Sequence, residues 1–227
     1  MSHRVTLPLG TVREVARSGR LKAGDFVDAA LLLAAEHGYG ALTLKQIGQH
    51  LGVDTTAVYR HFANKDELLA AMLDRSMDEA LLPETPGHER EWLERVAWTV
   101  RGIFMRHPPL VMALVARETG NPNSFALDNR VIAAFAALGL EGDDLVAHFQ
   151  AYDNFVLGAS LVDGISAPRH WELRALYFRG MEHPAMVAAG ASEESIRALS
   201  EEAFRIGLAA ILDAAVASAS SVARSRA

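Results

Sequence analysis

The sequence of 227 residues contains no cysteine. A disulfide framework and a cysteine-ligated metal site are therefore excluded, and the fold must be held together by a packed core. The chain also lacks a run of about 18 consecutive apolar residues and a recognisable secretory signal, so we expect no membrane-spanning helix. A cytoplasmic location is the simplest expectation.

Runs of alternating β-branched residues, which are typical of strands, are missing as well. Half of the residues are hydrophobic, and alanine and leucine are frequent, so the sequence predicts an all-α fold. The nine histidines include no pair four residues apart with a carboxylate on one helix. Neither a Gly-x-Ser-x-Gly elbow nor a phosphate-binding glycine loop occurs. We therefore expect no enzyme: no catalytic residue, no metal site and no cofactor.

Residues 43–62 have the pattern of two short helices joined by a tight turn. Thr43 is a favoured helix N-cap, and Gln46 three residues later completes a capping box. Gly52 can end the first helix in the left-handed region, and Asp54 then caps the second helix. This outline is typical of a helix-turn-helix DNA reader, although an ordinary helical hairpin within a core would show the same short-range pattern.

A third helix is predicted to begin directly after this motif. Asn64 is its expected N-cap, and Glu67 completes a second capping box. Lys65 lies in the first turn, where the helix N-terminus and a basic side chain both favour a phosphate group. The third helix therefore extends the candidate DNA-binding surface.

Residues 21–75 resemble the N-terminal domain of the tetracycline-repressor (TetR) family of transcriptional regulators. The segment before the motif looks like the family's first helix and its glycine stop. The residues that carry the resemblance are Phe26, Val27, Asp28, Ala29, Ala30, Leu31, Ala34, Ala35, Glu36, His37, Gly38, Tyr39, Thr43, Gly52, Val53, Ala57, Val58, Tyr59, Arg60, His61, Phe62, Asn64, Lys65, Asp66, Glu67, Leu68 and Leu69. The departures are Leu44, where many members carry a polar residue, and Asp54-Thr55-Thr56, where serine-proline pairs are frequent.

The resemblance implies a regulator of double-stranded DNA, most simply a repressor that acts as a homodimer on a palindromic operator. Polar side chains of the second helix are candidates for base contacts, and those around it are candidates for phosphate contacts. We expect Thr43, Lys45, Tyr59 and Lys65 to contact phosphates, and Thr55, Thr56, Arg60 and His61 to face the major groove.

Charge is unevenly distributed along the chain. The net charge is −6, yet residues 1–65 hold eight basic and five acidic residues, whereas residues 66–227 hold 14 basic and 23 acidic residues. The potential that favours DNA is therefore at the N-terminal end. Residues 1–21 carry four arginines and form either an arm that touches DNA or a loosely docked tail.

The chain divides into an N-terminal extension (residues 1–21), a helix-turn-helix domain (22–66) and a larger helical domain (67–227) for effector binding and dimerisation. Apolar periodicity and breaks at glycine and proline indicate where the helices of the larger domain lie. Helices are predicted at residues 64–82, 88–106, 110–118, 124–138, 144–163 and 169–182, and from residue 192 onward.

The last predicted helix carries two apolar stripes, whereas a helix on the surface of one subunit needs only one. Burial on two sides favours a dimer, and a helix central to a single subunit's core is the alternative. The resemblance implies that this helix and the one at 144–163 pair with their symmetry mates. The expected interface residues are Leu145, Val156, Ala159, Phe204, Leu208, Ile211 and Ala215.

Aromatic and methionine side chains are concentrated in the C-terminal part. Taken singly they favour core packing, but members of the TetR family commonly bind a small effector there, so the resemblance implies a mostly apolar cavity. The candidates are Phe104, Met105, Met112, Phe125, Phe135, His148, Phe149, Tyr152, Phe155, Trp171, Tyr177 and Phe178.

We therefore expect a small apolar or amphipathic effector that releases the repressor from its operator. One alternative is a DNA-binding regulator without an effector, controlled by its abundance or by a protein partner. Another is a small-molecule-binding protein or enzyme that has lost DNA binding, which the complete motif of residues 43–65 argues against.

Overall fold

The computed structural model describes residues 21–110, 122–164 and 170–226, and these ranges contain helices and no strand. The all-α prediction is confirmed. The chain splits into two compact units, Met1–Arg75 and Ser76–Ala227, so the structural boundary falls nine residues after the predicted one at residue 66. The predicted extension at 1–21 and the helix predicted at 110–118 lie, apart from Leu21 and Leu110, outside the described residues.

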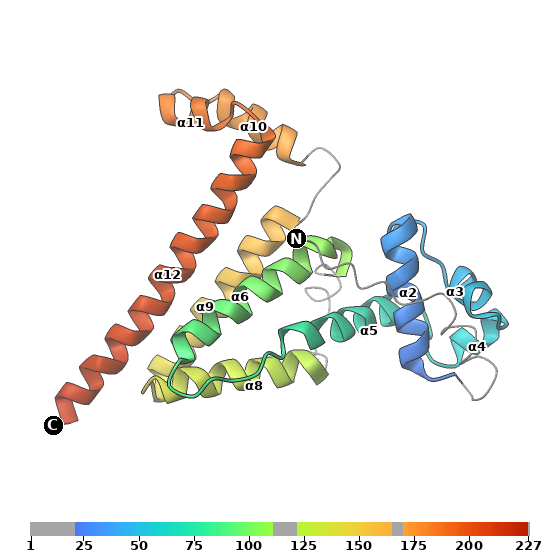
Figure 1. Ribbon diagram of the computed structural model, residues 1–227, viewed down its shortest axis with the longest axis horizontal. Helices are drawn as coiled ribbons and strands as arrows, with labels where there is room; N and C mark the ends of the chain where they lie inside the picture. Colours follow the sequence, from blue (N-terminus) through green and yellow to red (C-terminus); the bar gives the residue numbers. More distant parts are fainter. Residues whose placement is uncertain (1–20, 111–121, 165–169, 227) are drawn as a thin grey trace. The chain divides into compact units, whose positions relative to one another are not determined.

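The N-terminal unit is built from α2 (Ala23–His37), α3 (Leu44–Leu51), α4 (Thr55–Tyr59) and α5 (Lys65–Met77), shown in blue to green in Figure 1. Each of these helices contributes to one small core. Its most deeply buried side chains are Phe26, Ala30, Ile47, Val58, Leu68, Met72 and Leu73. Since the apolar faces point inward, the polar faces of α3 and α4 are left to the surface.

The predicted caps of α3 and α4 are confirmed. The Thr43 hydroxyl accepts a hydrogen bond from the Gln46 amide at 3.2 Å, and the Gln46 side chain accepts one from the Thr43 amide at 2.9 Å. Gly52 ends α3 with φ at +69°, a conformation that glycine adopts without a steric penalty. The Asp54 carboxylate accepts from the Thr56 amide at 2.8 Å and starts α4.

The third helix differs in detail from its prediction. The Asn64 side chain accepts from the Glu67 amide at 2.9 Å as expected, but the Glu67 carboxylate accepts from the amide of Ala63, one residue before the predicted partner. The helix was also predicted to continue to Leu82. It ends at Met77, and a single 3₁₀ turn, Asp78–Ala80, follows before Pro83.

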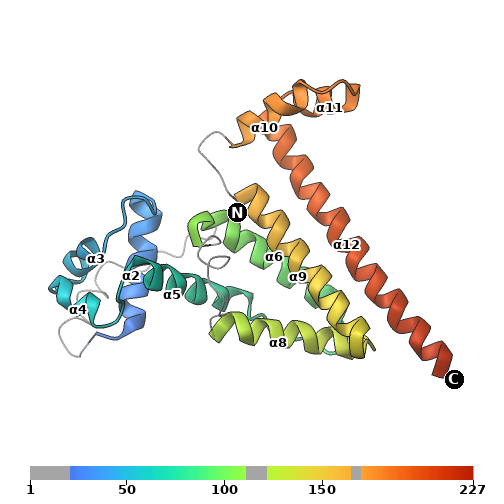
Figure 2. The ribbon, with the colours of Figure 1, turned by 180° about the vertical axis from the view of Figure 1, so that it is seen from behind.

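The C-terminal unit is a helical bundle. Its long helices are α6 (Glu89–Arg106), α8 (Pro122–Ala137), α9 (Gly142–Gly164) and α12 (Glu193–Arg226). Figures 1 and 2 show α6 and α9 side by side, and α9 also packs against α8 and α12. The core contains large side chains from all four helices: Trp92, Leu93, Ile103, Phe104, Phe135, Tyr152, Val156, Phe204, Leu208 and Leu212.

Two shorter helices, α10 (His170–Arg179) and α11 (Pro184–Ala189), pack on each other and on α12. The sequence predicted the first and missed the second, because Pro184 was interpreted only as a break. Proline is tolerated in the first turn of a helix, where its missing N–H has no partner to lose. His183 caps α11 by accepting a hydrogen bond from the Ala185 amide at 3.2 Å.

Helix α12 combines a packed face with a long apolar surface. By length and composition alone, Glu193–Ser221 is long and apolar enough to cross a membrane, although Glu201, Glu202 and Arg205 interrupt its apolar run. Its observed contacts are those of a bundle helix. Phe204 and Leu208 are buried against the rest of the unit, and Asp213 pairs with Arg90 of α6 at 2.7 Å.

Candidate DNA-binding surface and effector cavity

Helices α3 and α4 meet at a close backbone contact. A Cβ atom on Gly48 would lie 3.0 Å from the Val53 carbonyl oxygen and 3.5 Å from the Thr55 Cα atom. Few real Cβ atoms are that close to a neighbour, so the absence of a side chain at Gly48 lets α3 pack tightly on the turn. The glycine thereby fixes how α4 is presented at the surface.

Helix α4 carries three of the eight predicted DNA contacts, Thr55, Thr56 and Tyr59. Thr56 is exposed and the Tyr59 side chain is 56% exposed, whereas Val58 on the opposite face is completely buried. Thr55, beside the Gly48 contact, is partly buried. This arrangement presents polar side chains to a partner while one apolar residue anchors the helix.

Arg60 and His61 lie beyond the last residue of α4. The sequence placed them within the helix, but α4 ends at Tyr59 and Arg60 is its C-cap residue. Arg60 is exposed. His61 is exposed as well, but its ring packs on Phe26 of α2 with ring centroids 5.1 Å apart. That contact restricts the orientation of the imidazole.

The two predicted lysine contacts differ in their surroundings. Lys45 is exposed on α3. Lys65 is half-buried, and its ammonium group donates a hydrogen bond at 2.9 Å to the carbonyl oxygen of Tyr39, in the turn after α2. Lys65 therefore ties the start of α5 to that turn. The hydroxyl of Thr43 is likewise engaged in the cap of α3.

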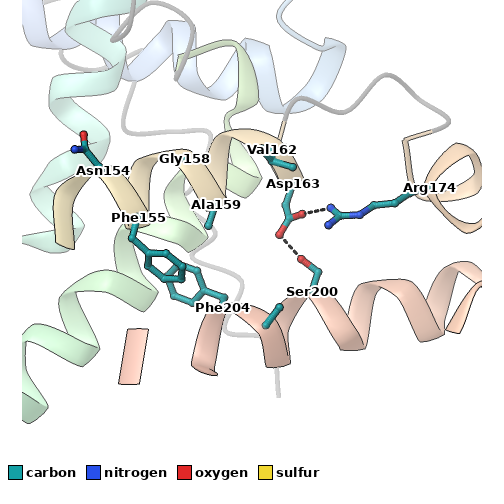
Figure 3. A pocket seen from close by; sticks show the side chains of 10 residues that line it. Asn154, Phe155, Gly158, Ala159, Val162, Asp163, Arg174, Ser200 and Phe204 are labelled. Carbon is teal, nitrogen blue, oxygen red and sulfur yellow. Dashed lines mark hydrogen bonds and ion pairs between the residues drawn. The ribbon is translucent and has the colours of Figure 1, made fainter. Parts of the chain in front are cut away.

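The C-terminal unit contains a cavity of about 370 Å³ that is open to solvent and lies among α9, α10 and α12 (Figure 3). Apolar side chains form most of its wall, and polar groups gather at one end. The lining residues are Asn154, Phe155, Gly158, Ala159, Val162, Asp163, Arg174, Ser200, Ala203 and Phe204. A second cavity of about 270 Å³ lies at α6 and α8 and is lined by Glu84, Thr85, Pro86, Glu89, Trp92, Arg130, Ala133, Ala134 and Ala137.

The polar end of the larger cavity is an ion cluster centred on Asp163. One carboxylate oxygen accepts from Arg101 of α6 at 2.7 Å and from the Ser200 hydroxyl of α12, and the other accepts from Arg174 of α10 at 2.6 Å. Arg101 and Asp163 are only 4% and 5% exposed. Because Asp163 belongs to α9, one buried carboxylate connects four helices. We call these four residues the Asp163 cluster.

Electrostatics keep Asp163 ionised. Burial alone would raise the pKa of this carboxyl, but hydrogen bonds from Ser200, Arg101 and Arg174, with the charge of Arg101, hold its pKa below the ordinary value. The Arg101 guanidinium also stacks over the Phe204 ring at 4.7 Å. Among the described residues, its Nη1 group has no hydrogen-bond partner although it is buried.

The predicted effector residues do not surround one cavity. Only Phe155 lines the larger one. Phe104, Phe135 and Tyr152 belong to the core, where the Tyr152 hydroxyl donates to the Leu93 carbonyl at 2.7 Å. Phe125 and Tyr177 are exposed, Phe149 and His148 are partly buried on α9, Met105 and Phe178 pack around Trp171, and Met112 lies outside the described residues.

The predicted dimer residues differ in their surroundings. Val156, Phe204, Leu208 and Ala215 are buried within the chain itself. Leu145, Ala159 and Ile211 are partly buried. One of the two apolar stripes of α12 consists of Ile196, Leu199, Ala203, Ile206 and Ala210. In this stripe Leu199 and Ile206 are about half exposed, whereas Ile196 is buried against Trp171. The sequence identified two stripes but assigned the inner one to the partner.

Sequence reasoning missed Arg101, Asp163, Arg174 and Ser200. A signal was present, since Asp163 continues the buried face of α9 that runs through Tyr152, Val156 and Ser160. A charged residue on the buried face of a helix predicts a buried partner of opposite charge. The sequence does not identify that partner, because Arg101 lies 62 positions from Asp163. Among the described residues, no group of three or more His, Asp or Glu is placed to hold a metal ion.

The fold and the exposed face of α4 define a helix-turn-helix regulator with a separate helical C-terminal unit. The model of the family described as "Bacterial regulatory proteins, tetR family" matches residues 26–72. The one described as "Tetracyclin repressor-like, C-terminal domain" matches residues 82–216. The chain therefore belongs to the TetR family of DNA-binding transcriptional regulators, a class that is not enzymatic.

Individual relatives agree with this assignment. The HTH-type transcriptional repressor Rv1353c of Mycobacterium tuberculosis (strain ATCC 25618 / H37Rv) is 28% identical over 219 residues, which cover 88% of this chain and 82% of that protein. Apo ActR from Streptomyces coelicolor superimposes with a TM-score of 0.71 at 23% identity, covering 90% of this chain and 99% of ActR. BioQ with its double-stranded DNA operator gives a TM-score of 0.59 at 22% identity, covering 87% and 99% of the two chains. These similarities show that the fold is shared.

Proposed function

We propose that this protein is a homodimeric, cytoplasmic repressor that a small-molecule effector releases from a palindromic DNA operator. The observation that carries the proposal is the exposed polar face of α4, held in position by the caps at Thr43 and Asp54. BioQ, which shares the fold, has been crystallised with its double-stranded DNA operator. A dimer of such readers requires half-sites about one DNA turn apart, roughly 34–36 Å.

Within this function, the exposed side chains have separate roles. Thr56 and Arg60 face the bases, and Arg60 is suited to a bidentate contact with guanine. Lys45 and Tyr59 contact the phosphates beside them. Lys65 and His61 act mainly by holding the surface together, since both contact other parts of the N-terminal unit.

The dimer is proposed to form through α9 and α12. Each presents large apolar residues to solvent, namely Val146 and Val162 on α9 and Leu199 and Ile206 on α12, which are 46% to 57% exposed. Large apolar side chains exposed on neighbouring helices are costly in water and favour a protein partner. A second copy is the partner that palindromic recognition needs.

Dimerisation is tested by sedimentation velocity of Ile206→Asp. The variant should sediment as a monomer at micromolar concentration, because a carboxylate would be desolvated at the interface. Leu32→Asp is the matched control, since Leu32 is similarly exposed but lies on α2. A dimer that survives Ile206→Asp would exclude this face.

Effector release depends on binding in the C-terminal unit. ActR, with the same fold, has been crystallised with (S)-DNPA and with actinorhodin. A ligand shifts DNA affinity only through its different affinities for the two protein states. We propose that the effector favours a dimer geometry in which the two α4 helices no longer match the half-sites.

The DNA function is tested with a site selected from a random duplex library by the full-length protein. Arg60→Ala and Tyr59→Ala should each weaken binding to that site in fluorescence anisotropy, with a loss of about 1–3 kcal/mol for Arg60. The control is Arg205→Ala, an exposed arginine on α12 that pairs with Glu202. If the protein selects no sequence, or if all three variants bind the site with equal affinity, α4 is not the helix that reads DNA.

A further inference from the structure

We infer that the cavity among α9, α10 and α12 binds an aromatic effector that carries a carboxylate or a similar oxyanion, and that Arg174 holds the anionic group. The inference rests on the proposed function, since it names the chemical class of the effector. It is carried by the charge balance of the Asp163 cluster and by the shape of the adjoining wall.

The Asp163 cluster has more positive than negative charge. Two guanidinium groups, those of Arg101 and Arg174, share the single carboxylate of Asp163. Both oxygens of that carboxylate are already engaged, and the buried Nη1 of Arg101 has no hydrogen-bond partner among the described residues. A buried cation without full compensation is costly. A second anion at the cavity end would complete the balance.

Arg174 is the cation that a ligand can reach. Its side chain lines the cavity and is 30% exposed, whereas that of Arg101 is 5% exposed. One nitrogen, Nη1, holds Asp163 at 2.6 Å. Figure 3 shows the guanidinium reaching from α10 to the end of the cavity. A guanidinium has five N–H donors in a planar fork, so Arg174 can keep Asp163 and bind an oxyanion as well.

The rest of the wall fits a flat apolar body. The rings of Phe155 and Phe204 stack at 5.3 Å with an interplanar angle of 24°. Ala159, Val162 and Ala203 add small apolar surface, and nothing lies within 4 Å of a Cβ atom built on Gly158. A volume of about 370 Å³ falls within the range of small-molecule sites, roughly 300–1,000 Å³. Aromatic rings against such a wall gain both burial and stacking.

The position of this cavity also gives the ligand a route to regulation. Val162 lines it and is one of the exposed residues that we propose for dimerisation, and Ile206 of α12 lies one helical turn from the lining residue Ala203. An occupant would therefore change the packing of α9 against α12 at the subunit interface. This links occupancy to the separation of the DNA-reading helices.

The test uses a pair of probes that differ in charge and little in shape, 2-naphthoate and 2-naphthamide, titrated calorimetrically into the full-length protein. The wild type should bind the carboxylate at least about tenfold more tightly than the amide, because charge-assisted hydrogen bonds are the stronger ones. Arg174→Gln should weaken naphthoate by about tenfold and change naphthamide by less than about twofold. Arg174→Lys keeps the positive charge but loses the planar set of N–H donors. Its affinity for naphthoate should therefore lie between those of the wild type and Arg174→Gln.

Arg205→Gln is the matched control, because it removes an exposed arginine of α12 outside the cavity and should change neither affinity. Equal affinity of the two probes for the wild type, equal loss of both in Arg174→Gln, or binding of neither would overturn the inference. Operator affinity is measured on the same samples without probe. Intact DNA binding with no discrimination between probes rejects only the effector class, whereas absent DNA binding by the wild type rejects the proposed function.

Discussion

The two units hold their charged side chains in opposite ways. In the N-terminal unit, Lys45 and Arg60 are exposed, and the carboxylate of Asp54 caps a helix at the surface. In the C-terminal unit, Arg101 and Asp163 are almost completely buried and connect four helices. Charge is thus available to DNA in one unit, whereas in the other a buried ion cluster holds helices together.

This difference predicts different consequences of substitution. Removing an exposed charge changes the affinity for a partner and leaves the free energy of unfolding nearly unchanged. Removing one member of a buried ion cluster leaves its partners desolvated and uncompensated, so the fold itself is weakened. Substitutions in both units test this contrast.

Asp163→Ala should have the largest effect. It leaves Arg101 buried without a counter-charge, so we expect a loss of about 3–5 kcal/mol in the free energy of unfolding. Urea unfolding followed by circular dichroism at fixed protein concentration measures it. Asp213→Ala is the control, since that exposed carboxylate also pairs with an arginine, and it should cost about 0–1 kcal/mol. Similar losses in the two variants would contradict the role assigned to burial.

Gly207→Ala should destabilise the packing of α12 on α9. A Cβ atom at this position would overlap the ring of Phe155. Overpacking typically costs about 1–3 kcal/mol, and the better helix propensity of alanine offsets about 1 kcal/mol of that loss. The same substitution in a Phe155→Ala background should be neutral or stabilising, which a double-mutant cycle of unfolding free energies will show. A loss that persists without the ring would point to another cause.

Asp128→Asn should stabilise the protein at neutral pH. Burial, together with the charge of Asp153, raises the pKa of the half-buried Asp128 to about 6. Since its pKa is higher in the folded state, this group favours folding below its unfolded pKa and loses that contribution as pH rises through about 6. The free energy of unfolding of the asparagine variant, measured by urea unfolding, should therefore exceed that of the wild type by on the order of 1 kcal/mol at pH 8 and by less at pH 5. A gain that is independent of pH would refute the titration.

Arg60→Ala should have the smallest effect on folding. Its free energy of unfolding should stay within about 0.5 kcal/mol of wild type, because the side chain is exposed and the C-cap hydrogen bond of α4 is made by the backbone N–H of Arg60. Thermal unfolding and operator affinity should be measured on one preparation. A variant that loses affinity through instability would show both changes together, and the contrast between the units would then fail.

Local signals explain what could be predicted. The caps at Thr43 and Asp54 and the turn at Gly52 depend on residues only two to nine positions apart, so the sequence located both ends of α3 and the start of α4. The same reasoning failed where a local signal had two meanings. Pro184 was interpreted as a break, although it occupies the first turn of α11. Arg60 was placed within α4, although the helix is too short to include it.

The sequence by itself determined the all-α architecture, the helix-turn-helix unit and the two-faced character of α12, because each depends on periodicity and on neighbours along the chain. Only the tertiary structure decided which stripe of α12 is inside, since both stripes are equally apolar and the choice depends on what α9 offers in return. It alone assembled the Asp163 cluster as well. Arg101, Asp163 and Ser200 lie 37 to 99 positions apart, and their pairing results from the crossing of the helices that carry them.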